Sequence, residues 1–187
     1  MKTKTIYLIR HCKATGQEAE APLTEEGERQ ARRLADFLAD RRIDKIVSSP
    51  FRRAIRSVEP LARRIGLDIA VDDRLRERVL SGRDLPDWME RLRASFEDMD
   101  IVLEGGESSR TATERARAAI EEQLAEDEEA ANIAVATHGN LMALILKCYD
   151  DRIGFEAWKA LTNPDVYELE FRGGICIGLG RVWEASD

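Results

Sequence analysis

The chain has 187 residues, of which 43% are hydrophobic and 35% charged, and its 29 Lys and Arg against 36 Asp and Glu give a formal charge of -7. This composition is typical of a folded globular protein and excludes a disordered, collagen-like or coiled-coil chain. The acidic balance disfavours nucleic acid as a partner, since such proteins usually present a basic surface. The longest apolar run, residues 141–146, is far shorter than the roughly 18 residues of a membrane span. We therefore expect neither a nucleic-acid nor a membrane partner.

The length of the chain predicts a single domain over residues 1–187, because most chains of this size fold around one core. Met1 is followed by a lysine and then by a short strand-like run, without the apolar stretch of a signal peptide, so we expect a cytoplasmic protein. The cysteines are Cys12, Cys148 and Cys176, and they form no C-x-x-C pair. Their spacing predicts neither a disulfide framework nor a zinc site.

The first part of the chain alternates short apolar runs with helical patterns. Residues 5–9 form the first predicted strand, and a helix capped by Thr24 follows, since apolar residues recur there at spacings of three and four. Residues 45–48 form the next predicted strand. A second amphipathic helix then ends at Gly66, a residue type common just after helices. Residues 68–72 alternate apolar and polar side chains, as a half-buried strand does.

The second part of the chain continues this alternation. Helices are predicted at residues 84–96 and from Ser108 to about Ala130. Residues 133–136 form a buried strand, and an apolar helix begins at Leu141. Two further strands, within residues 166–179, flank a Gly-Gly pair typical of a two-residue hairpin turn. The whole pattern predicts a three-layer α/β/α domain with a mostly parallel central sheet and an antiparallel edge or C-terminal hairpin.

The chain has two histidines, His11 and His138, and each directly follows a predicted buried strand. Ligands of α/β sheets bind outside the carboxyl ends of the strands, so two histidines in this position indicate a site more strongly than one would. Arg10 precedes His11, and its guanidinium suits bidentate binding of a phosphate or a carboxylate. Arg53 lies where residues 49–54 turn from a strand into a helix, whose amino end also favours an anion.

Six blocks carry a resemblance to a known family: LIRHCKATGQ at residues 8–17, LTEEGERQA at 23–31, SPFRRA at 49–54, RLRE at 74–77, GGES at 105–108 and VATHG at 135–139. They resemble the motifs R-H-G-[EQ]-[ST]-x-x-N, L-T-x-x-G-x-x-Q-A, S-P-x-x-R-A, R-L-x-E, G-E-S and V-x-x-H-G of the histidine phosphatase superfamily, in its phosphoglycerate-mutase-like branch. A single block would mean little, but six in the family's order are specific. The resemblance does not extend to the last forty or so residues, for which only the hairpin is predicted.

The resemblance implies a phosphatase that hydrolyses small-molecule phosphomonoesters through a covalent phosphohistidine, without a metal or another cofactor. His11 would be the nucleophile. Arg10, Arg53 and His138 would bind the phosphoryl oxygens, and Glu77 would donate a proton to the leaving alkoxide. Phosphoryl transfer depends mostly on in-line positioning and on cationic groups at the phosphoryl oxygens, and these residue types supply both.

Three positions depart from the family motif, and all lie in the loop after His11. Cys12 replaces the usual Gly, which either tightens the pocket, exposes a thiol to oxidation, or simply fits as a small residue. Ala14 replaces a Ser or Thr, although Thr15 stands next to it, and Gln17 replaces Asn but still carries an amide donor. We expect Thr15, Gln17 and Gly139 to contact the substrate.

Three alternative functions stay open. A cofactor-dependent phosphoglycerate mutase is disfavoured because the stretch from Glu77 to His138 is shorter than mutases of the family carry. A phosphohistidine-protein phosphatase is disfavoured by the presence of Glu77, which that subgroup typically lacks. A non-catalytic phosphate-binding module is disfavoured because the expected catalytic set is intact. Specificity is expected to come from residues that border the pocket: Lys13, Arg78, Arg83, Trp88 and the segment from Leu80 to Met99.

Overall fold

The computed structural model describes residues 2–125 and 131–184. In chain order the elements are β1 (Thr3–Arg10), α1 (Glu25–Ala39), β2 (Lys45–Ser48), α2 (Arg52–Ile65), β3 (Ile69–Val71), the 3-10 turn η1 (Asp73–Leu75), α3 (Trp88–Glu97), α4 (Ser109–Ala125), β4 (Asn132–Thr137), α5 (Gly139–Lys147), α6 (Phe155–Lys159), β5 (Asp165–Arg172) and β6 (Ile175–Arg181).

The described strands form one mixed sheet in the order β3-β2-β4-β1-β5-β6. The pairs β3–β2, β2–β4 and β4–β1 are parallel, whereas β1–β5 and β5–β6 are antiparallel. Gly173 and Gly174 join the last two strands with φ angles of 58° and 79°, the left-handed conformation that a two-residue hairpin turn requires. The mostly parallel sheet and its antiparallel C-terminal edge, predicted from the sequence, are confirmed.

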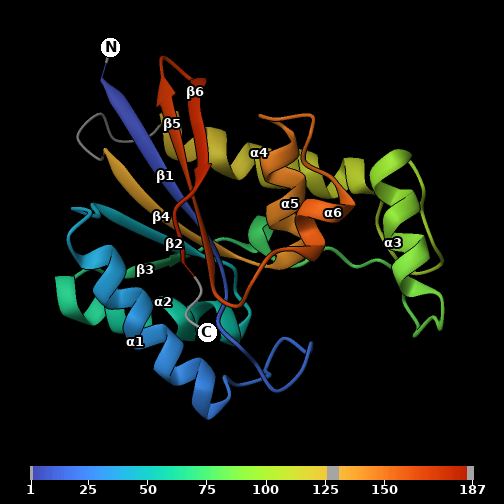
Figure 1. Cartoon of the computed structure of the whole chain (residues 1–187), viewed down its shortest axis with the longest axis horizontal. Helices are drawn as coiled ribbons and strands as arrows, with labels where there is room; N and C mark the ends of the chain where they lie inside the picture. The colour runs from blue at the N-terminus through green and yellow to red at the C-terminus, as the bar shows by residue number, and fades with distance from the viewer. Residues whose placement is uncertain (1, 126–130, 185–187) are drawn as a thin grey trace.

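The sheet separates two apolar clusters, because successive side chains of a strand point to opposite faces. Ile6 and Leu8 of β1 belong to one cluster, which α3, α4, α5 and α6 cover. Tyr7 and Ile9 belong to the other, which α1 and α2 cover. Figure 1 shows α1 and α2 together on one side of the sheet and α4, α5 and α6 on the other, with α3 outermost. This is the predicted three-layer arrangement.

Local chemistry explains most helix boundaries. Thr24 caps α1, since its Oγ1 accepts a hydrogen bond from the Gly27 N–H at 3.0 Å. Gly66 ends α2 with a φ of 72°. The helix predicted from residue 84 begins only at Trp88, because Pro86 disfavours helical geometry at the residue before it. The last residues of the helix predicted to reach Ala130 lie outside the described residues.

Two short elements were not predicted, namely α6 and η1, because five and three residues are too few to show helical periodicity. In the part of the chain that the structure describes, no helix combines the length and the apolar character that crossing a membrane would need.

Candidate active site

Parallel pairing of β1 with β4 brings the two histidines together. The register places Arg10, the last residue of β1, opposite Thr137, the last residue of β4. His11 and His138 therefore leave the sheet side by side, with 5.2 Å between their ring centroids. The His11 N–H also donates to the Thr137 carbonyl oxygen at 3.1 Å, which continues the ladder by one residue. The sequence placed both histidines at strand ends, and the sheet makes them neighbours.

Arg53 joins them from the first turn of α2, with only 1% of its surface exposed. Its Nε donates to Nε2 of His11 at 3.2 Å. Its Nη1 donates to the carbonyl oxygens of Gln17 and Glu18 at 2.9 and 2.8 Å, which fixes the guanidinium against the loop after β1. The guanidinium carbon also lies 5.0 Å from the ring centroid of Phe51, whose ring contacts His138 edge-on at 4.9 Å.

The hydrogen bonds of His11 select one ring tautomer. Because Arg53 donates to Nε2, that nitrogen must carry a lone pair. The proton then sits on Nδ1, which donates to the Cys12 carbonyl oxygen at 2.7 Å. Burial, which the charges of Arg53 and Arg10 reinforce, lowers the pKa of His11 to about 3 against the opposing effect of the hydrogen bond to the Cys12 carbonyl. At neutral pH His11 is therefore an uncharged imidazole whose Nε2 lone pair accepts the hydrogen bond from Arg53.

His138 is completely buried at the amino end of α5. Its Nε2 lies 2.7 Å from Oγ of Ser49, and the same Oγ accepts from the Phe51 N–H at 3.2 Å. The Ser49 hydroxyl can thus donate its proton to Nε2, which leaves an N–H on Nδ1. The pKa of His138 lies well below 6.5, mainly because the ring is buried. Electrostatic interactions with His11, Arg53 and Arg10 also lower it. The sequence marked Ser49 only as part of a motif and gave no sign of this contact.

Arg10 reaches across the end of β1 toward α5. Its Nη1 donates to the Leu161 carbonyl oxygen at 3.0 Å. A Cβ on Gly139 would lie 2.9 Å from Nε of Arg10, so only glycine leaves room for the guanidinium there. Burial lowers the pKa of Arg10, and the carboxylates of Glu77 and Asp165 oppose that effect.

Glu77 is anchored at the amino end of α5. Its Oε2 accepts from the Asn140 N–H at 3.0 Å, and its Oε1 accepts from the Leu141 N–H at 2.9 Å and from the Arg78 N–H at 2.8 Å. The segment before it is tied to β4, because Thr137 Oγ1 donates to the Leu75 carbonyl oxygen at 2.8 Å. The carboxylate thus lies at the helix that His138 begins.

Several of these residues and their sequence neighbours carry buried side-chain nitrogens without a hydrogen-bond partner. Among the described residues they are Arg10 Nε, Arg78 Nη2, His138 Nδ1 and Asn140 Nδ2, and the other buried polar side-chain atoms in this state belong to α4. All four nitrogens can donate, and a buried donor without an acceptor costs roughly 1–3 kcal/mol. Arg10 and His138 lie at the neighbouring ends of β1 and β4, so an anion bound there would supply acceptors for Arg10 Nε and His138 Nδ1.

Thr15 and Gln17, which the sequence predicted as substrate contacts, have exposed side chains. Thr15 Oγ1 donates to the Pro22 carbonyl oxygen at 3.3 Å, and Gln17 supplies a backbone carbonyl to Arg53. The structure brings neither side chain into the histidine–arginine cluster.

Cys12 is fully buried in the part of the core that α1 and α2 cover, and burial raises the pKa of its thiol to about 12. Cys12 is therefore a packing residue rather than a reactive thiol.

The residues expected to set specificity differ in burial. Arg78 is buried, and its Nη1 donates to Ser95 Oγ on α3 at 2.7 Å. Lys13 and Arg83 are exposed, and each forms an ion pair with a glutamate. Trp88 is 44% exposed at the start of α3.

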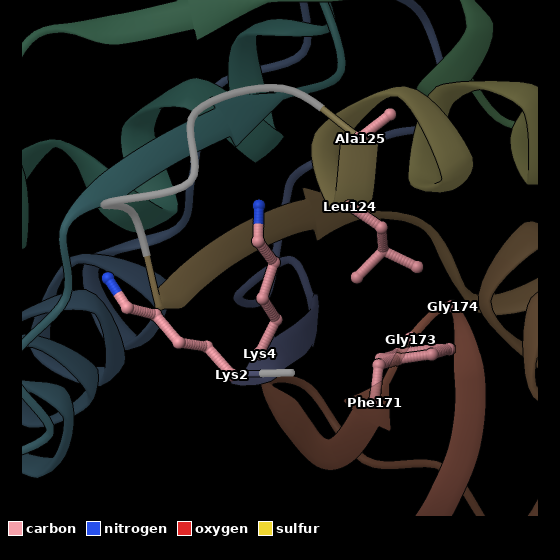
Figure 2. Close-up of a pocket in the computed structure, with 7 residues that line it drawn as sticks. All are labelled: Lys2, Lys4, Leu124, Ala125, Phe171, Gly173 and Gly174. Carbon is pink, nitrogen blue, oxygen red and sulfur yellow. The ribbon is translucent and has the colours of Figure 1, made fainter.

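A hollow of about 530 Å³ lies at the opposite end of β1 (Figure 2). Figure 2 shows Lys2 and Lys4 at the start of β1 and Leu124 at the end of α4, and none of the expected site residues lines the hollow. In residues 2–125 and 131–184, moreover, no group of three or more His, Cys, Asp or Glu side chains could hold a metal ion. The expected site residues Arg10, His11 and His138 lie instead at the carboxyl ends of β1 and β4.

Comparisons with known proteins assign the chain to a family. Residues 6–177 match the family model of the histidine phosphatase superfamily (branch 1). A Salmonella paratyphi A protein named "Probable phosphoglycerate mutase GpmB" is 26% identical over 97% of this chain and 91% of its own length. Mycobacterial glucosyl-3-phosphoglycerate phosphatase, solved with inorganic phosphate, is 29% identical with a TM-score of 0.77, covering 98% of each chain.

A phosphoglycerate mutase from Bacillus anthracis, at 19% identity, shares the fold with a TM-score of 0.76 over 97% of this chain and 93% of its own. The family model covers nearly the whole chain. The chain belongs to the histidine phosphatase superfamily.

Proposed function

We propose that the protein is a phosphatase that hydrolyses small-molecule phosphomonoesters through a phosphorylated His11, without a metal ion. The observation that carries the proposal is the state of His11, a buried and neutral imidazole whose Nε2 lone pair faces the guanidinium of Arg53. A nucleophile of this kind needs no base to activate it, and an adjacent cation favours an incoming anionic phosphoryl group.

The first chemical step would form the phosphohistidine. Nε2 of His11 attacks phosphorus and the ester P–O bond breaks. Glu77, which enters this step as the carboxylic acid, transfers its proton to the departing oxygen and is left as the carboxylate. Arg10, Arg53 and His138 bind the phosphoryl oxygens. The Arg53 Nε–H exchanges His11 Nε2 for a phosphoryl oxygen, and the unpartnered nitrogens of Arg10 and His138 gain acceptors. Unit charges 4 Å apart interact by about 4 kcal/mol at an effective dielectric constant near 20, so each arginine contributes strongly.

The second step would release phosphate. A water oxygen attacks phosphorus, Glu77 takes the water proton, and the P–Nε2 bond breaks. His11 returns to the neutral form, and its Nδ1–H still donates to the Cys12 carbonyl. The scheme is ping-pong, because the alcohol leaves before water reacts.

The relatives support a phosphatase and keep a mutase as the second candidate. The mycobacterial phosphatase was solved with inorganic phosphate, the product that this scheme releases. The Salmonella relative carries a mutase name, and a mutase would return the phosphoryl group to a second hydroxyl instead of to water.

The test is an aryl phosphate assay in the presence of EDTA. Wild-type protein should release inorganic phosphate and should take up an acid-labile phosphoryl group, and His11→Ala should do neither. Retained turnover in His11→Ala would overturn the assignment of His11 as the nucleophile. Complete loss of wild-type activity in EDTA would overturn the metal-free scheme. Phosphate binding without hydrolysis would indicate a non-catalytic module. Transfer of the phosphoryl group to 3-phosphoglycerate rather than to water would indicate a mutase.

Two arginines of α2 make a matched pair for the same assay. Arg53→Ala should reduce kcat/KM by roughly 10²-fold or more, as expected when a preorganised donor to the transition state is removed. Arg56 lies on the same helix but pairs with Glu28 and Glu59 on the surface, so Arg56→Ala should keep wild-type activity. Equal activities of the two variants would contradict the phosphate-binding role of Arg53.

A further inference from the structure

The peptide bond between His11 and Cys12 is held at both of its polar groups by side chains from distant parts of the chain. Asn163 Nδ2 donates to the His11 carbonyl oxygen at 2.8 Å. The N–H of Cys12 donates to Ser57 Oγ, also at 2.8 Å, and this hydroxyl donates in turn to the Arg53 carbonyl oxygen at 2.6 Å. The peptide plane cannot rotate without breaking both contacts.

This peptide controls how the His11 ring is presented. The ring's Nδ1–H donates to the Cys12 carbonyl oxygen, which is the next backbone acceptor after the held peptide. If the peptide turned, that carbonyl would move away from Nδ1, and the ring would lose the contact that keeps its proton on Nδ1. The Nε2 lone pair would then no longer be fixed toward Arg53.

The segment that carries Asn163 is itself firmly anchored. Asp165, at the start of β5, is fully buried and accepts from Arg181 at 2.8 and 2.7 Å through its two oxygens. The same carboxylate accepts from the Thr162 N–H at 2.9 Å. One residue earlier, the Leu161 carbonyl accepts from Arg10, so one short segment contacts two consecutive site residues.

We propose that Asn163 is a positioning residue that fixes the orientation of the His11 imidazole through the His11–Cys12 peptide. The proposal rests on the proposed role of His11 as nucleophile. Asn163 acts through the backbone, so its loss should lower the rate of attack by His11 and leave phosphate binding by the arginines nearly unchanged. Misplacement of a reacting group by about 1 Å can cost about 10²-fold in rate.

The kinetic test compares two asparagines of the same chemistry. Asn163→Ala should lower kcat for an aryl phosphate by roughly 10- to 100-fold with little change in KM, and should slow single-turnover phosphorylation of His11 equally. The matched control is Asn132→Ala. The Asn132 amide also donates to a backbone carbonyl, that of Arg42 at 3.2 Å, but at the amino end of β4. The Asn132→Ala variant should keep the wild-type kcat.

Thermal unfolding of both variants separates positioning from folding. Asn163→Leu serves if the alanine variant does not fold, because it keeps a side chain of similar size and shape, removes the N–H donor and adds no charge. A folded Asn163 variant with the kcat of Asn132→Ala would overturn the proposal.

A second readout is independent of activity. The chain contains two histidines, so a protein labelled with ¹⁵N in histidine shows only two imidazole rings. Wild type and Asn132→Ala should show His11 protonated at Nδ1, and Asn163→Ala should show a mixture of tautomers. An unchanged tautomer together with an unchanged kcat would overturn the positioning role alone. A wild-type protein that neither hydrolyses aryl phosphate nor forms phosphohistidine would overturn the proposed function and, with it, the effect of Asn163 on the rate of attack by His11.

Discussion

His11 combines two properties that a free histidine lacks at neutral pH. An exposed imidazole has a pKa near 6.5 and is partly protonated, and it exchanges between two tautomers. Here burial and two nearby guanidiniums hold the pKa at about 3, and the bonds to Cys12 and Arg53 leave one tautomer. The cost of desolvating the ring therefore produces a neutral nucleophile with a fixed lone pair.

Glu77 is the residue for which the substrate decides the effect of a mutation. We predict that Glu77→Gln lowers kcat/KM for alkyl phosphates by roughly 10²- to 10⁴-fold, because a poor leaving group needs a proton donor. Aryl phosphates should lose much less, since a phenolate leaves without protonation. Parallel assays of one alkyl and one aryl ester measure the difference.

The control for this variant is its thermal stability, because Glu77 also accepts three backbone hydrogen bonds around the start of α5. An amide can replace only some of these, so a modest loss of stability is expected. Similar losses for both esters would show that Glu77 acts only by holding α5 and is not the proton donor.

At the scale of elements, the site is made by the ends of β1 and β4 and by the starts of α2 and α5. Each element contributes one end, and the packing of Arg10 against Gly139 shows how closely these ends approach. The motif H-G thus has a steric reason in this structure, since a side chain at this position would meet a guanidinium.

Gly139→Ala tests that close approach. Alanine has the higher helix propensity, so α5 itself should not suffer, but its Cβ would displace Arg10. We predict folded protein with kcat/KM lowered by about tenfold or more, since an arginine that binds the phosphoryl group loses its position. A steady-state assay beside a thermal melt measures both properties.

Gly154→Ala is the matched control at the start of α6. A Cβ there would meet nothing within 4 Å, and the residue has an extended backbone with a φ of -156°. It should keep wild-type activity. Full activity in Gly139→Ala would show that Arg10 can move without consequence.

At the scale of the whole molecule, burial of two histidines links stability to pH. Both rings have a lowered pKa in the folded state, whereas in the unfolded chain they titrate near 6.5. Below that pH the unfolded chain binds protons that the folded protein does not, so the free energy of unfolding falls as the pH falls. The contribution is complete above pH 6.5 and is lost progressively toward the folded-state pKa values.

We predict that the denaturant concentration at the unfolding midpoint decreases as the pH is lowered from 7 to 5. This range lies above that in which most carboxylates titrate. Chemical unfolding at a series of pH values measures it. His11→Asn removes one of the two rings and should show a shallower dependence. A midpoint that does not change over this range would mean that the histidines titrate normally in the folded protein.

The sequence by itself determined the layered α/β fold and the position of both histidines at strand ends, because apolar periodicity is a local pattern. The set Arg10, His11, Arg53, Glu77 and His138 came from the family resemblance and stays a prediction.

The tertiary structure decided what Cys12, Thr15 and Gln17 contact, and it brought Ser49, Ser57 and Asn163 to the histidines. An asparagine that follows α6 carries no local signature of contact with a backbone carbonyl 152 residues earlier. Such contacts arise only when β5 pairs with β1 and places the segment before it beside the start of the loop that holds His11.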